Sequence, residues 1–165
     1  HSSNNYGPYQ YPEKLIPLII NRLIEKKKLP IYGKGKNIRD WIYVKDHAQA
    51  IIKLLKKGKS QNSYTIGSNN EISNIRLIHK LIKIYSSLKD DTYNYKNLIS
   101  YIKDRPGHDF RYAINNKKIK SNINWTPKLT FNKALNKTVN FYVKNKKNLS
   151  KYFYNDKWLK KKYNK

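Results

Sequence analysis

The residue types best suited to anion chemistry gather in a few short segments of the chain. Three of its five arginines lie in residues 38–41 and 104–112, as Arg39, Arg105 and Arg111. An arginine offers a permanently charged fork that binds a phosphate through two parallel hydrogen bonds. Four of the six glycines lie in or beside these two segments and residues 4–9. Glycine permits tight turns and close backbone approach. We therefore expect anion chemistry at these places.

One turn in particular has the composition of a ligand-binding tip. Pro106-Gly107 fits the two central positions of a type II turn, which would project Arg105 and His108 to the same exposed tip. Together with Asp104, these side chains suit a charged, hydrogen-bonding ligand such as a phosphate ester. The alternative is an ordinary polar turn.

A second glycine-rich turn precedes Arg39. The sequence Gly33-Lys34-Gly35 resembles a phosphate-cradling loop, but it lacks the Gly-Lys-Ser/Thr ending and the helix start of the Walker pattern. A tight hairpin turn between two strands is the stronger interpretation. Such a turn would hold Arg39 beside a cleft. An ion pair between Arg39 and Asp40 is the other possibility, and the spacing alone does not decide between the two.

Two further patterns predict no catalytic or metal site. The Tyr-x-x-x-Lys spacing, used by oxidoreductases when both residues share a helix face, occurs at Tyr32…Lys36 and Tyr142…Lys146. The first pair spans a glycine turn, and in the second we expect a core-facing Tyr and a solvated Lys. We interpret both as chance matches. None of the four histidines has a ligand-like partner four residues on, so we predict no metal site.

The net charge of +26 says less about partners than its size implies. Lys, Asn, Ile and Tyr make up more than half of the 165 residues, and all four are favoured by AT-rich codons. The basic residues are mainly scattered lysines, whereas a nucleic-acid reader tends to gather arginines on one face. We expect no specific nucleic-acid partner, with a basic nucleic-acid-binding module as the alternative. No apolar run approaches the ~20 residues of a membrane span, so we also expect no membrane partner.

Apolar periodicity predicts the elements that must position these side chains. Short strands alternate with helices without a repeat or linker, which indicates one α/β unit. The expected strands are residues 29–32, 38–43, 63–66, 98–103 and 111–114. The expected helices are residues 12–28, 46–58, one beginning at 73 or 74, 115–122 and 130–147. On the helix at 46–58, helical spacing predicts a core face made of Val44, Ala48, Ile51, Ile52 and Leu55.

Several segments, taken in order, resemble the dTDP-glucose 4,6-dehydratases, a family of extended short-chain dehydrogenases. The resemblance follows residues 4–17, 29–35, 39–48, 64–67 and 104–113, and continues through Trp125-x-Pro127 and Thr130-Phe131. Asn-Asn-Tyr-Gly-Pro-Tyr with Pro-Glu-Lys-Leu, and Asp-Arg-Pro-Gly-His-Asp, are specific to this family. Arg-Asp-Trp-x-Tyr-Val is shared with nucleotide-sugar epimerases. The resemblance weakens after about residue 148.

The resemblance implies the C-terminal, substrate-binding portion of an extended Rossmann-type α/β enzyme. Residues 1–12 would be the junction with an NAD-binding Rossmann domain, and residues 150–165 a tail. The sequence begins at His1 and contains no Met, so we expect a fragment of a longer protein. That longer protein would be a cytoplasmic lyase and could form a homodimer. It would convert dTDP-glucose to dTDP-4-keto-6-deoxyglucose, with NAD as a transient hydride carrier.

The same resemblance assigns a dTDP-sugar site residue by residue. Asn4 would contact the sugar, Asn5 the NAD cofactor, and Arg39 the diphosphate. The remaining substrate contacts would come from Lys14, Leu15, Pro30, Ile31, Tyr32, Asn74, Asp104, Arg105, Pro106, Gly107, His108 and, as a weaker match, Tyr163. The chain has neither the family's glycine-rich loop nor its acidic pair, so we expect it to be inactive alone. A related epimerase or decarboxylase is the alternative within the superfamily.

Overall fold

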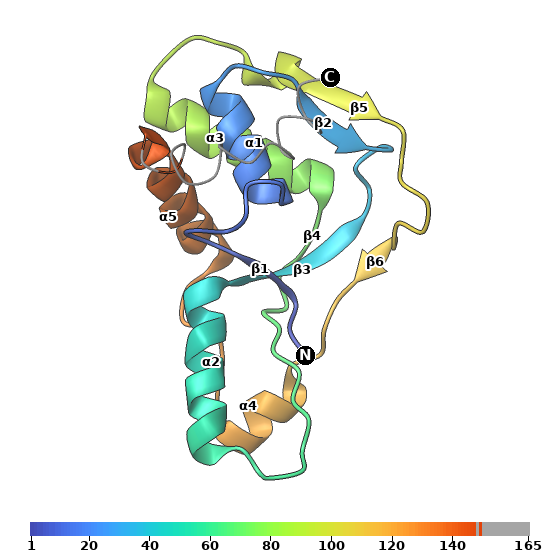
Figure 1. Ribbon diagram of the computed structural model, residues 1–165, viewed down its shortest axis with the longest axis vertical. Helices are drawn as coiled ribbons and strands as arrows, with labels where there is room; N and C mark the ends of the chain where they lie inside the picture. The colour runs from blue at the N-terminus through green and yellow to red at the C-terminus, as the bar shows by residue number, and fades with distance from the viewer. Residues whose placement is uncertain (148, 150–165) are drawn as a thin grey trace.

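Two groups of helices lie at opposite ends of the molecule, with strands between them (Figure 1). The computed structural model describes residues 1–147 and 149. Its strands are β1 (Asn4–Tyr6), β2 (Leu29–Tyr32), β3 (Ile38–Tyr43), β4 (Glu71–Ser73), β5 (Ile99–Ile102) and β6 (Arg111–Tyr112). Its helices are α1 (Leu15–Ile24), α2 (Val44–Lys57), α3 (Asn74–Lys89), α4 (Lys117–Ile123) and α5 (Phe131–Lys144), with a 3₁₀ turn at Tyr95–Leu98. The predicted α/β class is confirmed.

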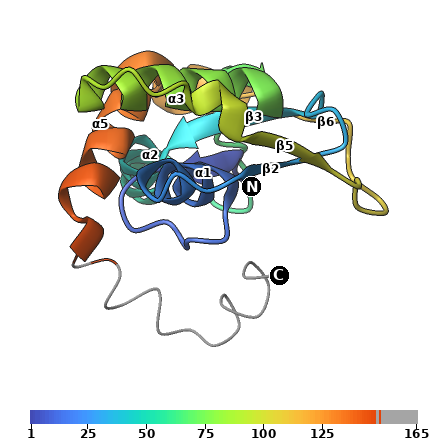
Figure 2. The ribbon, with the colours of Figure 1, turned by 90° about the horizontal axis from the view of Figure 1, so that it is seen from above.

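The strands form two separate sheets. In the first, β3 is central: it pairs in parallel with β1 and β6 and antiparallel with β4. In the second, β2 pairs in parallel with β5 alone. The Gly33–Gly35 turn therefore connects two sheets, and the prediction of a hairpin between β2 and β3 is wrong. The loop that joins β5 to β6 extends away from the helices (Figure 2).

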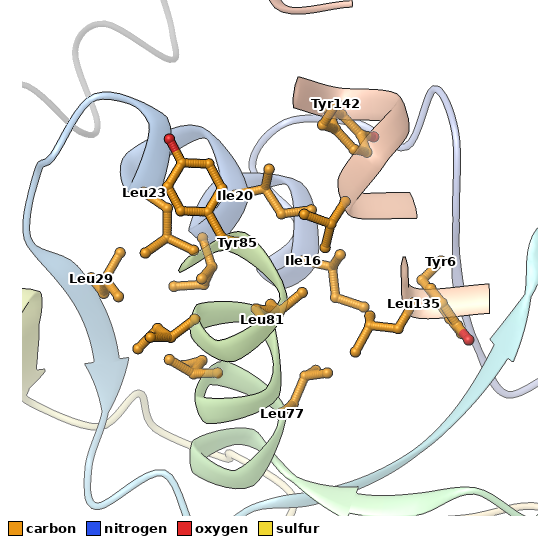
Figure 3. Close-up of a cluster of buried hydrophobic side chains, with 14 of the residues drawn as sticks. Tyr6, Ile16, Ile20, Leu23, Leu29, Leu77, Leu81, Tyr85, Leu135 and Tyr142 are labelled. Carbon is orange, nitrogen blue, oxygen red and sulfur yellow. The ribbon is translucent and has the colours of Figure 1, made fainter. Parts of the chain in front are cut away.

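The larger hydrophobic core lies between α1, α3 and α5 (Figure 3). Each of these helices repeats apolar residues at intervals of three and four, which places them on one face. The fully or almost fully buried side chains include Ile16, Ile20, Leu23, Leu77, Leu81, Tyr85, Leu135 and Tyr142. The Tyr142 hydroxyl donates a hydrogen bond to the Gln10 carbonyl at 3.0 Å, as expected for a core tyrosine outside any catalytic pair. This core holds α1 in place, and the first turns of α1 form one wall of the cavity described below.

A smaller core at the other end contains α2 and α4, and here the predicted core face of α2 is wrong. Ala48 is exposed, Val44 is only half-buried, and Leu55 is 82% exposed, with Ile51 and Ile52 also exposed. The buried positions of α2 are Asp46 and Ala50. The Asp46 carboxylate accepts hydrogen bonds from the backbone N–H groups of residues 128 and 129, at 3.2 and 3.4 Å, which turns that side inward.

Other differences from the sequence predictions concern short elements and helix ends. The helix expected over residues 12–28 is shorter, because Lys26 adopts a positive φ of 52° just after it. Residues 63–66 form no strand; Ile66 makes only an isolated parallel bridge with Ser2. The short strands β1 and β4 were not predicted. In the described part of the chain, no helix has the length and apolarity needed to cross a bilayer.

Candidate functional site

A cavity of about 850 Å³ lies where the two sheets and α1 meet. It brings together eleven of the predicted site residues: Asn4, Asn5, Lys14, Leu15, Pro30, Ile31, Tyr32, Arg39, Asn74, Arg105 and His108. Asp104, Pro106 and Gly107 do not line it. Tyr163 lies outside the described residues. Side chains that are scattered over a hundred positions of sequence therefore share one hollow.

Several lining residues were not predicted from the sequence. They are Gln10, Glu13, Leu18, Arg22, Lys28, Trp41, Ile78, Ser100 and Ile102. Trp41 and Leu18 could have been predicted from the residues already assigned to the site. Trp41 shares a face of β3 with Arg39, and Leu18 lies one helical turn after Lys14. Ser100 and Ile102 could not have been predicted, because their position depends on the pairing of β5 with β2, which no local sequence pattern reveals.

Arg39 lines the cavity from the middle of the first sheet and is only 8% exposed. Its Nη1 donates a hydrogen bond to the Ile38 carbonyl at 2.7 Å. Asp40 faces the other side of β3, where its carboxylate accepts hydrogen bonds from the Ser68 hydroxyl and from the N–H groups of Ser68 and Asn70. The alternative of an Arg39–Asp40 ion pair is therefore wrong. Arg39 is instead a lining residue of the cavity.

The charge around the cavity is strongly positive. Burial lowers the pKa of Arg39 below its ordinary value; Asp109 acts against this shift and Arg105 adds to it. Three more cations line the same hollow, from Lys14, Arg22 and Lys28, whereas Glu13 is its only acidic lining residue among those described. Low-dielectric walls strengthen the field of such charges on a bound anion. The cavity is therefore suited to a multiply charged anion.

The loop from Asp104 to His108 forms an exposed turn at residues 104–107, but His108 does not share the exposed tip predicted for it. Gly107 has a φ of +65°, which suits the third position of a type II turn. The His108 side chain is nevertheless only 6% exposed, and its Nδ1 lies 2.7 Å from the Asp104 Oδ1. Its ring also meets the edge of Tyr32, with 6.2 Å between centroids. The loop thus turns His108 back toward β2 and the cavity.

Buried polar atoms without hydrogen-bond partners concentrate on the residues around this cavity. Among the described residues there are five such side-chain atoms: Ser3 Oγ, Asn5 Oδ1, Gln10 Oε1, Trp41 Nε1 and Asn74 Oδ1. All except Ser3 belong to lining residues. An unsatisfied buried polar group costs about 1–3 kcal/mol, so four of them around one cavity are consistent with a polar ligand that binds there.

The family model for GDP-mannose 4,6 dehydratase matches residues 1–138. The chain belongs to this family. It is 48% identical over 148 residues to a dTDP-glucose 4,6-dehydratase of Escherichia coli. It is also 48% identical to the solved dTDP-glucose 4,6-dehydratase of Bacillus anthracis, crystallised with NAD, at a TM-score of 0.79. The resemblance found in the sequence is thereby confirmed.

These alignments cover most of this chain but less than half of each relative. The Escherichia coli alignment covers 87% of this chain but 41% of the relative. A Streptomyces venezuelae dTDP-glucose 4,6-dehydratase with NAD and TYD bound gives a TM-score of 0.80 at 36% identity, over 88% of this chain and 43% of the other. A UDP-glucose 4-epimerase of Thermotoga maritima, at 23% identity and a TM-score of 0.76, shares the fold. This chain thus spans under half the length of these relatives.

Proposed function

We propose that this chain is the sugar-nucleotide-binding part of a dTDP-glucose 4,6-dehydratase. The observation that carries the proposal is the cavity in which buried Arg39 is joined by Arg105 and His108, all three on motifs shared with that family. A diphosphate is the ligand that gains most from a buried guanidinium, because it accepts two parallel charge-assisted hydrogen bonds.

The geometry divides the proposed ligand into three parts. Pro30, Ile31 and Tyr32 lie on β2 and supply an apolar wall for the thymine base. Arg39 on β3 and the β5–β6 loop provide cationic groups for the diphosphate. Asn4 on β1, with Lys14 at the start of α1, lies on the lining of the same cavity and provides hydrogen-bonding groups for the sugar.

The residues of this chain do not fit NAD as a whole. The six glycines form no G-x-G-x-x-G loop, which is the element that seats the cofactor's pyrophosphate. Asn5, with its unpaired Oδ1, is the one candidate contact. We propose that most NAD contacts and the catalytic groups belong to the part of the relatives that this chain does not cover. When bound, NAD supplies reversible hydride transfer; this chain's own role is to bind and orient the sugar nucleotide.

The alternatives are less well supported. The Thermotoga maritima epimerase shares the fold at 23% identity, whereas the two dehydratase structures reach 48% and 36%. The lysines are distributed over α2, α3, α4, α5 and the loops rather than gathered on one element, which does not favour a nucleic-acid-binding module. A cytoplasmic location and a homodimeric parent enzyme are further parts of the proposal.

Calorimetric titration of the 165-residue chain with dTDP, UDP and duplex DNA at about 150 mM salt tests the proposal. We expect saturable dTDP binding, weaker UDP binding, and DNA binding that disappears as salt is raised. We also expect no turnover of dTDP-glucose by the chain alone, even with NAD added. DNA binding that resists salt, with no dTDP heat, would show that the proposal is wrong.

A further inference from the structure

One face of the β2–β5 ladder lines the cavity. The two strands are parallel, and their register pairs Pro30 with Ser100 and Tyr32 with Ile102. Side chains that are paired in register, or that lie two positions apart on one strand, point to the same side of a sheet. All four of these residues line the cavity. Tyr101, which alternates with them on β5, does not line it and is 60% exposed. The ladder therefore presents the four side chains as one surface in the cavity.

Ser100 has the smallest side chain on this surface and brings a hydroxyl group beside Pro30. Neighbouring strands lie about 4.8 Å apart, which sets the separation of the two backbones. Ser100 is half-buried, and its hydroxyl forms no hydrogen bond with the described residues. A short side chain beside larger ones leaves room for a ligand atom, and here that room adjoins an unused hydrogen-bonding group.

Two cationic side chains line the cavity at the same end of the ladder. Lys28 directly precedes β2, and Arg22 is held next to it because its Nη1 donates a hydrogen bond to the Lys28 carbonyl at 3.0 Å. Neither an ammonium nor a guanidinium group can accept a hydrogen bond. Hydroxyl dipoles turn in the local field, so the Ser100 oxygen is drawn toward these cations and its hydrogen is available to a ligand. This end of the cavity therefore favours a ligand atom that accepts hydrogen bonds.

We infer that the Ser100 hydroxyl donates a hydrogen bond to a keto oxygen of the pyrimidine base, and that Ser100 is a specificity-determining residue of the nucleotide site. The inference rests on the proposed function, in which the base lies against Pro30, Ile31 and Tyr32. Both keto oxygens of thymine lie on the edge of its ring. A base that lies against Pro30 brings one edge to the neighbouring Ser100. The apolar wall then holds the ring, and the hydroxyl fixes its orientation.

Calorimetric titration with dTDP and with inorganic diphosphate tests the role of the hydroxyl. Ser100→Ala should weaken dTDP binding by about fivefold, the change that corresponds to one hydrogen bond of about 1 kcal/mol. Binding of inorganic diphosphate should be unchanged, because this ligand has no base. Ser100→Thr keeps a hydroxyl group and should bind dTDP as the unmodified chain does. Tyr101→Phe is the matched control: it removes a hydroxyl from the adjacent, exposed position of β5 and should alter neither affinity.

Thio analogues of dTDP identify the oxygen that accepts the hydrogen bond. Sulfur is a weak acceptor. In the unmodified chain, sulfur in place of one keto oxygen, at position 2 or 4 of the ring, should weaken binding by a factor close to that of Ser100→Ala. Sulfur at the other position should have little effect. In Ser100→Ala neither analogue should bind more weakly than dTDP, because the donor is absent.

Equal dTDP affinity of Ser100→Ala and the unmodified chain would overturn the inference and leave the proposed function standing. A loss of dTDP and inorganic diphosphate binding to the same extent would also overturn it, because the substitution would then act on the whole cavity rather than on the base. Insensitivity of the unmodified chain to both thio analogues would overturn it without any variant. Failure of the unmodified chain to bind dTDP would overturn the proposed function as well.

Discussion

Arg39 and Asp40 are adjacent in sequence but belong to opposite faces of β3. The alternation of side chains along a strand keeps the two charges apart. Asp40 is satisfied by the hydroxyl of Ser68 and the backbone N–H groups of Ser68 and Asn70, so it does not neutralise Arg39. Although the formal charges of Arg39 and Asp40 cancel, only the positive charge of Arg39 lies at the cavity.

We predict that Arg39→Lys weakens dTDP-glucose binding by about tenfold or more, although the charge is retained. A lysine offers one point charge in place of a planar fork, and loses a charge-assisted hydrogen bond of about 1.5–3 kcal/mol. Calorimetric titration measures the affinity. Arg76→Lys, at an exposed position of α3, is the control and should bind normally. Equal affinity of Arg39→Lys and the control would argue against a diphosphate contact at Arg39.

Single site residues could be predicted from the sequence where their residue type is rare in this chain. They could not be predicted where their role depends on a contact between distant parts of the fold. Arg39 could be predicted because arginines are few among many lysines. The folding of His108 back onto Asp104 could not, since a four-residue spacing inside a loop implies no shared face. The resemblance to a family supplied Asn4 and Lys14, which no local pattern singles out.

Among the elements, the turn at residues 67–70 holds β3 in place by enclosing the Asp40 carboxylate. Gly67 makes this possible, because a Cβ atom there would lie 2.8 Å from Asp40 Oδ2 and 2.9 Å from the Ile114 carbonyl oxygen. A second contact spans the same strand: Arg111 of β6 and Glu71 of β4 form a bidentate ion pair with both distances at 2.7 Å. By the strand register, this pair lies on the Asp40 face, opposite the cavity.

We predict that Asp40→Asn lowers the free energy of unfolding by about 1–3 kcal/mol. The amide NH₂ replaces one acceptor oxygen and leaves a buried backbone N–H group without a partner. Thermal or urea unfolding followed by circular dichroism measures the loss. Asp90→Asn is the matched control: it is exposed and has a left-handed φ of 50°, which asparagine tolerates well, so its stability should be unchanged. If both variants unfold alike, the enclosed carboxylate does not stabilise β3.

All five α-helices, which are long enough to show a period, were predicted, although their ends differ. The bounds of β2 and β3 were predicted as observed, and α3 begins where its cap was expected. Strand β4, with three residues, is too short to show an alternation. The pairing of β2 with β5 joins residues about 70 positions apart, which no local pattern indicates. The sequence therefore predicted a hairpin between the neighbouring strands β2 and β3, and that prediction is wrong.

Over the part of the molecule that the structure describes, α2 has an apolar side that is exposed. Ile51, Ile52 and Leu55 lie there at exposures of 44%, 54% and 82%. Helical spacing correctly identified these residues as one face but could not say which way it points. The polar anchor at Asp46 and the small second core decide that, because they use the Ala50 side of the helix.

We predict that Ile52→Lys with Leu55→Lys leaves the free energy of unfolding within about 0.5 kcal/mol of the unmodified chain, because exposed positions lose little on substitution. Binding of an apolar dye such as ANS should fall at the same time. Ala50→Lys is the control, since it places a charge at a fully buried position of the same helix and should unfold the chain. A large destabilisation by the double variant would show that this face is packed in solution.

The separation of the two sheets has a consequence for how such a site diversifies. The β2–β5 ladder shares no strand with the ladder that holds β3, so a change in β2 disturbs none of the hydrogen bonds that fix Arg39. The wall proposed for the base and the strand proposed for the diphosphate are thus independent modules joined by a glycine turn. Selection can alter which nucleotide is accepted while the handling of its phosphates is inherited intact.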